Sequence, residues 1–232
     1  MSDTNLGAKT VGSIVADDFR AAEVFKKAGI DFCCGGNRSL DETCRLKGID
    51  QGKLESEILG LADTQVNQAQ NFKEWDLGFL CDYIMNTHHK FVLKNLPELV
   101  FYTGKIASVH GEHHPELVEV AGLFSKINQE LLQHLAKEEE VLFPAIRKAI
   151  AGGDPGASAI IKSEISRMSG EHEVAGGLMD KINVITGGYL VPDDGCNTYK
   201  VTFRLLEQFE DDLHVHVHLE NNILYPKALK IS

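Results

Sequence analysis

The chain has 232 residues, of which 43% are hydrophobic and 25% charged, with a formal net charge of −11 and a pI near 5.3. This length allows one large domain or two modest ones. The negative charge repels phosphate backbones and no basic patch offsets it, so we expect no nucleic-acid binding. No apolar run reaches the roughly 18 to 20 residues of a membrane span, and the N-terminus lacks the pattern of a signal peptide. We therefore expect a cytoplasmic protein with no membrane partner.

Residues 10 to 60 predict short helices around a loop. Apolar residues at helical spacing begin at Val11 and stop at Ala28-Gly29, a typical helix end. The segment DFCCGGN that follows must then be a turn, and Ser39 or Asp41 can cap the next helix. From residue 62 to 76 the chain becomes polar, which predicts a linker with a boundary near residue 70. We expect a small helical domain at residues 1–65 and a second domain at residues 75–232.

The second domain contains four or five helical segments. The segments GEHHP near residue 111, AGGDPGAS at 151–158 and GGYLVPDDGCN at 187–197 separate them and are rich in turn formers. No segment shows sustained alternation of apolar and polar residues, so we predict an all-α fold. A four-helix bundle is the simplest architecture for it.

An internal repeat lies within this domain. Residues 134–144 (HLAKEEEVLFP) align without a gap to residues 216–226 (HVHLENNILYP). Both copies read His-x-x-x-Glu, two polar residues, an apolar triplet that ends in an aromatic residue, and proline. Because Glu139 and Glu140 align with asparagines, only Glu138 has a carboxylate counterpart, which is Glu220.

The two His-x-x-x-Glu pairs fall within the apolar stripes of their helices, as does His172, so we expect all five side chains to face the core. A buried carboxylate is costly unless it is paired or bound to metal, and these stripes hold no Lys or Arg. Imidazole and carboxylate suit iron, manganese or zinc, and two bridging carboxylates favour a dinuclear centre. The alternative is a polar core network, or pairs that face solvent.

Other histidines are not sorted by spacing alone. His88 and His89 fit the same apolar stripe, and the histidines that open the GEHHP turn can also reach inward. A straight helix would hold His89 and His110 roughly 30 Å apart, so both can bind one centre only if the chain breaks between them, at Pro97 or Gly104. His214 and His218 lie off the stripe of their helix, and we interpret them as surface residues.

These residues together carry a family resemblance that covers nearly the whole chain. They are His89, Leu96-Pro97-Glu98-Leu99, His110, His134 to Glu138, Phe143-Pro144, Glu171-His172-Glu173, His216 to Asn222 and, in the first domain, Asp31 to Gly36. The chain resembles haemerythrin-like domains, and in particular the Repair of Iron Centers family of iron–sulfur cluster repair di-iron proteins.

The resemblance implies two non-haem iron ions, oxo-bridged, in a haemerythrin-like four-helix bundle. It implies repair of iron–sulfur clusters damaged by nitric oxide or oxidative stress, by donation of iron to damaged iron–sulfur proteins, with nitric oxide or oxygen as small ligands. It also selects His89 over His88 and His110 over His113. Tyr225, where the first repeat has Phe143, is a departure that we expect not to disturb ligation. The implied metal ligands are His89, His110, His134, Glu138, His172, His216 and Glu220.

Four further residues are tentative site residues. Glu130 and Glu171 lie where side chains that support the ligands or line an exit path would be, although surface or capping acids are the ordinary interpretation. Cys33 and Cys34 are adjacent, and such pairs rarely form a disulfide without strain. Thiol chemistry by transient iron binding, electron donation or mixed disulfides is one interpretation, and small residues before a Gly-Gly turn are the other. We interpret Cys44, Cys81 and Cys196 as structural.

Three other functions use similar residues. A haemerythrin-like oxygen or nitric oxide sensor needs the same ligands but no cysteine domain. A di-iron nitric oxide or peroxide reductase needs an open coordination position, so the sequence leaves enzyme activity undecided. A ferritin-like ferroxidase normally carries more carboxylates and Glu-x-x-His motifs. A homodimer is also left open.

Overall fold

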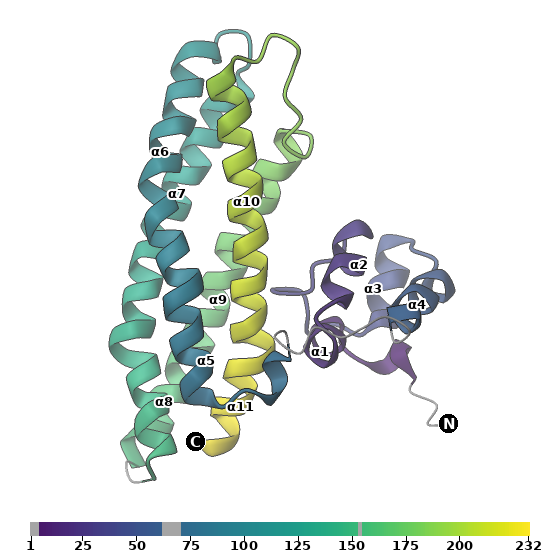
Figure 1. Ribbon diagram of the computed structural model, residues 1–232, viewed down its shortest axis with the longest axis vertical. Coiled ribbons are helices and arrows are strands. Elements are labelled where there is room, and N and C mark those ends of the chain that lie inside the picture. The colour runs from purple at the N-terminus through teal and green to yellow at the C-terminus, as the bar shows by residue number, and fades with distance from the viewer. Residues whose placement is uncertain (1–4, 62–70, 153–154) are drawn as a thin grey trace.

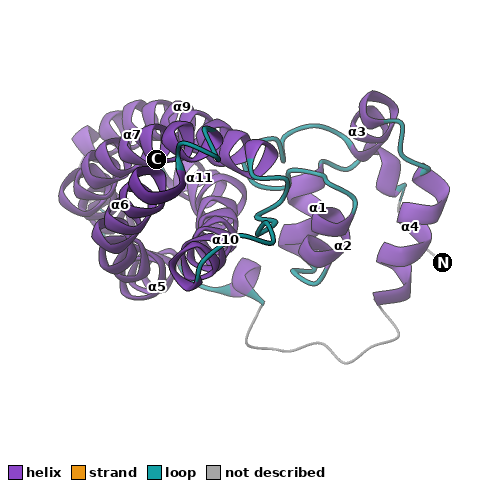
Figure 2. Cartoon of the chain, turned by 90° about the horizontal axis from the view of Figure 1, so that it is seen from above, coloured by secondary structure: helices purple, strands orange, loops and turns teal. Residues whose placement is uncertain are grey.

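The computed structural model describes residues 5–61, 71–152 and 155–232, and within these ranges every regular element is a helix (Figures 1 and 2). The prediction of an all-α protein is therefore confirmed. Within the same ranges, no helix combines the length and the apolar character needed to cross a lipid bilayer.

The leading domain consists of short helices with side-chain caps. Thr10, Ser39 and Asp50 each accept a hydrogen bond from the backbone N–H three residues later, which satisfies one of the free donors at a helix start. Gly29, at φ 65°, follows the helix end expected there. The helices are the 3₁₀ turn η1 (Leu6–Ala8), α1 (Val11–Asp17), α2 (Ala21–Lys27), α3 (Leu40–Lys47) and α4 (Gln51–Gly60).

The second domain is a bundle of four long rods, as predicted (Figure 1). One rod is the single helix α9 (Pro155–Ile185), and each of the other three joins two helices through one π-helical turn. These three rods are α5 (Leu77–Ile84), η5 (Met85–His89) and α6 (Lys90–His110); α7 (Glu116–Lys137), η6 (Glu138–Leu142) and α8 (Phe143–Ile150); and α10 (Asn197–Leu219), η7 (Glu220–Leu224) and α11 (Tyr225–Ile231).

The π turns coincide with the histidine and glutamate motifs. A π turn carries one residue more than an α turn and is common at functional sites. Two of the π turns are followed by a helix whose second residue is proline, Pro144 in α8 and Pro226 in α11. Proline has no N–H to donate and its ring displaces the preceding turn, so a widened turn at this place fits both prolines.

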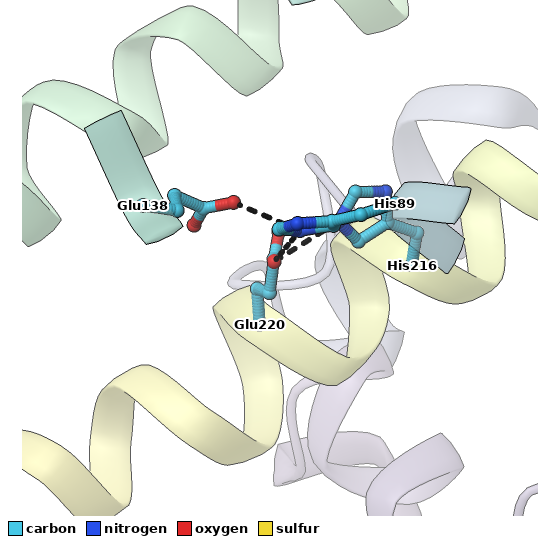
Figure 3. Close-up of side chains that lie close together, drawn as sticks. All are labelled: His89, Glu138, His216 and Glu220. Carbon is cyan, nitrogen blue, oxygen red and sulfur yellow. Dashed lines mark hydrogen bonds and ion pairs between the residues drawn. The ribbon is translucent and has the colours of Figure 1, made fainter. Parts of the chain in front are cut away.

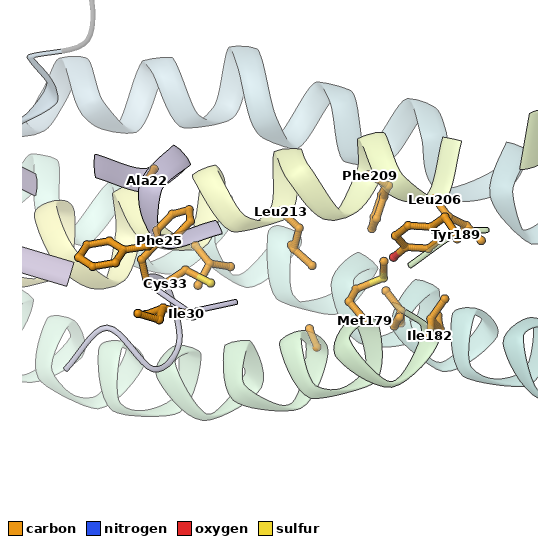
Figure 4. Packing of buried hydrophobic residues seen from close by; sticks show 14 of the residues in the cluster. Ala22, Phe25, Ile30, Cys33, Met179, Ile182, Tyr189, Leu206, Phe209 and Leu213 are labelled. Atoms are coloured by element: carbon orange, nitrogen blue, oxygen red, sulfur yellow. The ribbon is translucent and has the colours of Figure 1, made fainter. Parts of the chain in front are cut away.

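The leading domain packs along the bundle rather than standing apart from it. Figure 4 shows Phe25, Ile30 and Cys33 of the leading domain in one apolar cluster with Leu213 and Met179 of the bundle. The predicted boundary near residue 70 lies outside the described residues.

Part of the predicted linker is structured. The 3₁₀ turn η4 (Phe72–Glu74) carries a buried Phe72, whose ring lies 5.2 Å from that of Phe19 and 4.8 Å from that of Trp75. This aromatic contact joins the leading domain to the start of the bundle.

Two glycines allow the cysteine loop to approach the bundle closely. Gly12 N donates to Gly36 O at 2.7 Å, and a Cβ atom on Gly36 would lie 2.4 Å from Phe32 O. From the bundle, Asn222 Nδ2 donates to Phe32 O at 3.2 Å. The loop is therefore held between α1 and η7 by backbone contacts that leave no room for a side chain at Gly36.

We predict that Gly36→Ala lowers the free energy of unfolding by about 1–3 kcal/mol, because the new methyl group overlaps backbone that cannot shift independently. Urea unfolding followed by circular dichroism measures this. Gly104→Ala is the matched control: a Cβ atom there meets no neighbour, and alanine in a helix gains up to about 1 kcal/mol over glycine. An unchanged urea midpoint for Gly36→Ala would contradict the close approach.

Candidate metal centre

Six buried side chains from the four rods converge in the bundle core. They form two groups that share Glu138 and Glu220, and in each group the donor atoms lie within 4.8 Å of one another. Each of the six is at most 2% exposed. Figure 3 shows one of the groups. The first group is His89, Glu138, His216 and Glu220, and the second is His134, Glu138, His172 and Glu220.

The local sequence places these donors. His134 and Glu138, like His216 and Glu220, are one turn apart and therefore project from the same side of a rod. Glu138 and Glu220 each begin a π turn, and His89 ends the third one.

Each glutamate lies between histidines of different rods. Glu138 Oε2 is 3.3 Å from His89 Nε2 and 3.4 Å from His134 Nε2. Glu220 has Oε1 3.0 Å from His216 Nε2 and Oε2 3.1 Å from His172 Nε2. Both carboxylates are thus placed between two imidazoles, as a pair of shared ligands requires.

The donor atoms fit a metal better than they fit one another. Among the described residues, His89 Nε2, Glu138 Oε2 and Glu220 Oε2 are buried and make no hydrogen bond of good geometry, although each faces another donor or acceptor at 3.1–3.3 Å. Buried polar atoms are normally satisfied, so several such atoms around one point indicate a ligand that bonds to lone pairs. Imidazole nitrogen and carboxylate oxygen suit iron, manganese or zinc. The residues present therefore fit a metal centre.

The electrostatics of the six buried side chains also favour a bound cation. Burial alone would lower the pKa of His89, but the carboxylates of Glu138 and Glu220 raise it to about 10. Burial would likewise lower the pKa of His134, but the same two carboxylates raise it to about 9. Burial and Glu220 would raise the pKa of Glu138, but the histidines around it lower it to about 2. The raised pKa values indicate that His89 and His134 carry protons beside Glu138, and a metal ion bound there would displace these protons.

The outer nitrogens of three ligand histidines have polar partners. His89 Nδ1 lies 2.8 Å from Glu139 Oε1, and His172 Nδ1 lies 3.0 Å from Asn221 Oδ1. His134 Nδ1 lies 2.9 Å from Glu171 Oε2. Such contacts fix the ring and leave Nε2 directed at the centre.

The fourth ligand histidine, His216, has no such partner. Its Nδ1 is buried without a hydrogen bond in the part of the chain that the structure describes, and the ring of His88 stacks on it at 5.5 Å. The Nδ1 of His88 lies 2.9 Å from Asp212 Oδ1. His88 therefore packs against a ligand but does not belong to either donor group.

The internal repeat extends beyond the ligands. Glu139 and Asn221 occupy equivalent positions in the two copies, and each contacts the outer nitrogen of a histidine from another rod. The aromatic positions match as well, since Phe143 stacks on His89 and Tyr225 on His172. Residue spacing alone assigns no role to Glu139 or Asn221, and their equivalent positions in the repeat are the only local signal for one.

Tyr225 adds a contact that Phe143 lacks. Its hydroxyl donates to Glu138 Oε1 at 2.7 Å, and burial raises the pKa of the phenol well above its ordinary value. The departure between the two repeats therefore acts on a carboxylate of the centre itself.

The assignment of His110 as a ligand is wrong. The helix α6 continues unbroken through Pro97 to His110, because Leu96 and Leu99 beside the proline are buried in the bundle and hold the helix in place. His110 consequently lies at the far end of the rod from His89, and its Nε2 is 3.2 Å from Cys196 Sγ. The centre has four histidines rather than five.

The interpretation of His218 as a surface residue is also wrong. Its side chain is fully buried, its ring packs against that of Phe32, and its Nδ1 lies 3.2 Å from Asn222 Nδ2. Burial lowers its pKa to about 4. The leading domain covers this face of α10, which the periodicity of α10 alone does not reveal. His214 on the same face is half-buried.

The two tentative acids differ in their placement. Glu171 contacts His134 and also accepts a hydrogen bond from Lys137 Nζ at 2.7 Å. Glu130 is exposed, and no contact within the described ranges links it to the ligands.

The cysteine pair lies directly beside the centre. Cys34 Sγ donates to the backbone oxygen of His172 at 3.3 Å, and Gly176 on α9 leaves space for the sulfur. Cys33 and Cys34 are free thiols whose sulfurs are 3.9 Å apart. The Cys34 neighbour and burial raise the pKa of Cys33 well above its ordinary value, so Cys33 stays protonated at neutral pH.

Comparisons with known proteins agree with this geometry. The description "Domain of Unknown function (DUF542)" applies to residues 7–62, and "Hemerythrin HHE cation binding domain" applies to residues 82–228. Among curated relatives, the iron–sulfur cluster repair protein ScdA of Staphylococcus epidermidis is 33% identical over 219 residues, and that of Staphylococcus haemolyticus is 34% identical over 217. The iron–sulfur cluster repair protein YtfE of an Enterobacter species is 32% identical over 222 residues. Each alignment covers 94% of this chain and 96% of the relative.

We predict that Glu138→Gln reduces the bound metal to one ion per chain or fewer, because an amide cannot replace a carboxylate shared between two sites. Metal analysis of the purified, folded variant measures this. The exposed Glu140→Gln is the matched control and should keep the full content. Glu139→Gln should weaken binding by roughly tenfold to a hundredfold through His89. Equal losses from Glu138→Gln and Glu140→Gln would contradict the assignment.

We predict that metal binding at pH 7.5 releases about two protons, because His89 and His134 are protonated in the metal-free protein and must be neutral as ligands. Since raised pKa values are involved, the release should persist to about pH 9 and fall as the pH passes about 10. Calorimetric titration of the apoprotein in buffers of different ionisation enthalpy counts the protons. A binding heat that does not depend on the buffer would show that the two histidines are already neutral.

Proposed function

Because the chain belongs to the Repair of Iron Centers family of haemerythrin-like proteins, we propose that it holds two non-haem iron ions and donates iron in the repair of damaged iron–sulfur clusters. Damage by nitric oxide or oxidative stress is the condition under which the clients need iron. The relatives named above are iron–sulfur cluster repair proteins, and the alignments span both domains.

The observation that carries this proposal is the buried set of four histidines and two glutamates. Two donor groups with shared carboxylates favour two ions over one. In the proposed arrangement His89 and His216 bind one iron, His134 and His172 bind the other, and Glu138 and Glu220 bridge them. An oxo bridge between the ions is part of the same proposal. Bound iron would supply Lewis acidity and redox chemistry at this place.

The ligand set also supports donation. The carboxylates of Glu138 and Glu220 attract a ferric ion more strongly than a ferrous one, since the Coulomb energy scales with the charge. When iron leaves, His89 and His134 take up protons and form ion pairs with Glu138, which compensates its buried negative charge. Protonation of these histidines would stabilise the folded protein after iron release, as an iron donor requires.

The cysteine pair gives the leading domain a place in this function. The Cys34 thiol touches the backbone of the ligand His172, whereas the buried Cys33 faces Asp31. We assign transient thiol contact with the leaving iron to Cys34. A simple oxygen carrier or sensor would have no use for this contact, so the observation favours repair over that alternative.

We predict that the reduced, iron-loaded protein transfers iron to a ferrous chelator or an apo iron–sulfur protein at least about tenfold faster than the oxidised protein, because the reduced ions are held more weakly. Stopped-flow absorbance measures both rates. Glu171→Gln should change the rate through His134, and the exposed Glu130→Gln is the control. Equally slow release from both forms, together with turnover of nitric oxide or peroxide, would replace the donor proposal with that of a reductase.

A further inference from the structure

A second group of donor side chains lies at the junction between the leading domain and the bundle. Asp180 of α9, which is exposed, the buried Glu210 and the half-buried His214 of α10 each place one donor atom within 4.8 Å of the other two. Glu210 and His214 are one helical turn apart, which is the spacing that places His216 and Glu220 at the main centre. The three residues line a cavity of about 440 Å³ that the loop at Ile30 borders from the leading domain.

Burial makes Glu210 an unusual carboxylate. Glu210 is only 6% exposed. Asn183 Nδ2 donates a hydrogen bond to its Oε2 at 2.9 Å. A neutral amide compensates a buried negative charge poorly. The neighbouring Tyr189 is 8% exposed, and its hydroxyl interacts with Glu210 but makes no hydrogen bond of good geometry among the described residues. Burial raises the pKa of Glu210, and burial together with Asp31 raises that of Asp180.

The ammonium groups that line the cavity are engaged elsewhere. Lys26 pairs with Asp211, and Lys47 Nζ donates to Gly29 O at 2.7 Å. The three donors therefore face one another without a direct cationic partner among the described residues. Two carboxylates and one imidazole that converge in this way form a ligand set for a divalent transition-metal ion.

The other donor group outside the main centre is a weaker candidate. Asp31, Cys33 and Cys34 also lie together, but Asp31 Oδ1 already accepts from the N–H groups of Cys33 and Cys34, and Oδ2 from that of Gly35. The carboxylate of Asp31 therefore holds the backbone of the cysteine loop, which makes Asp31 a weaker candidate for a metal ligand.

We propose that Asp180, Glu210 and His214 form a third metal site, which binds one divalent transition-metal ion separately from the core centre. Three protein ligands leave coordination positions for water or for an incoming thiol, so the ion is held exchangeably. An adjoining cavity is lined by Cys34, Asp180 and His214 together, which connects the site to the cysteine pair. The role of this site rests on the proposed function: it holds a ferrous ion released from the core before the ion is transferred.

The test uses the full-length, oxidised, di-iron protein dialysed against Co²⁺, with cobalt and iron counted per chain. We expect one cobalt beside two irons, with visible absorption typical of nitrogen and oxygen ligands. Glu210→Gln and His214→Ala should each weaken cobalt binding roughly tenfold or more while the iron content and the melting temperature stay unchanged. The exposed Glu207→Gln, on the same helix, is the matched control.

The outcomes separate this site from the proposed function. No cobalt beyond the core, or equal binding by Glu210→Gln, His214→Ala and the unchanged protein, overturns the third site and leaves iron donation from the core intact. Iron transfer to an apo iron–sulfur protein should be at least twofold slower in His214→Ala. An unchanged transfer rate with cobalt binding lost would overturn the holding role.

Discussion

Two carboxylates buried in an apolar helical bundle are the constraint on which the rest of this structure depends. Glu138 and Glu220 are fully inaccessible, and within the described ranges the groups placed to compensate them are imidazoles rather than Lys or Arg. Isolated ionised carboxylates in such a place would cost several kcal/mol each. The four histidines from four rods, and the metal ions that they fit, resolve this cost.

Much of the surrounding structure serves that convergence. The π turns begin or end at His89, Glu138 and Glu220, so that the widened turns and the donors coincide. Glu139 and Asn221 hold histidine rings from other rods, and the aromatic residue at the end of each repeat stacks on the same rings. Each copy of the repeat thus supplies a histidine and glutamate pair, a partner for a histidine ring of another rod and an aromatic ring that stacks on it, and the hydroxyl of Tyr225 adds a contact that Phe143 lacks.

The leading domain shares in this arrangement. Asn222, directly after two residues that serve the centre, donates to the backbone of the cysteine loop, and Cys34 contacts the backbone of His172. A displacement of the loop would therefore act on η7 and on α9 near a ligand. The junction also gathers Asp180, Glu210 and His214 near the thiols, so carboxylate and imidazole donors occur both in the core and at the boundary between the domains.

The sequence by itself determined the helical class, the four rods and five of the six donor side chains that converge in the core, because helical periodicity and the repeat in 134–144 and 216–226 are local properties of the chain. It left the choice between His88 and His89 open, which the family resemblance made in favour of His89. It did not determine which distant residues meet. The sequence places His110 wrongly, because Pro97 alone does not reveal that α6 stays continuous with buried Leu96 and Leu99 on either side of the proline.

His218 was misplaced because its burial comes from another domain, and no pattern within α10 records that contact. The partners of the ligand histidines, the approach of the cysteine loop and the junction cluster were likewise decided only by the tertiary structure. Each of them joins residues far apart in the chain, whose distance depends on how whole rods pack rather than on the spacing within one rod.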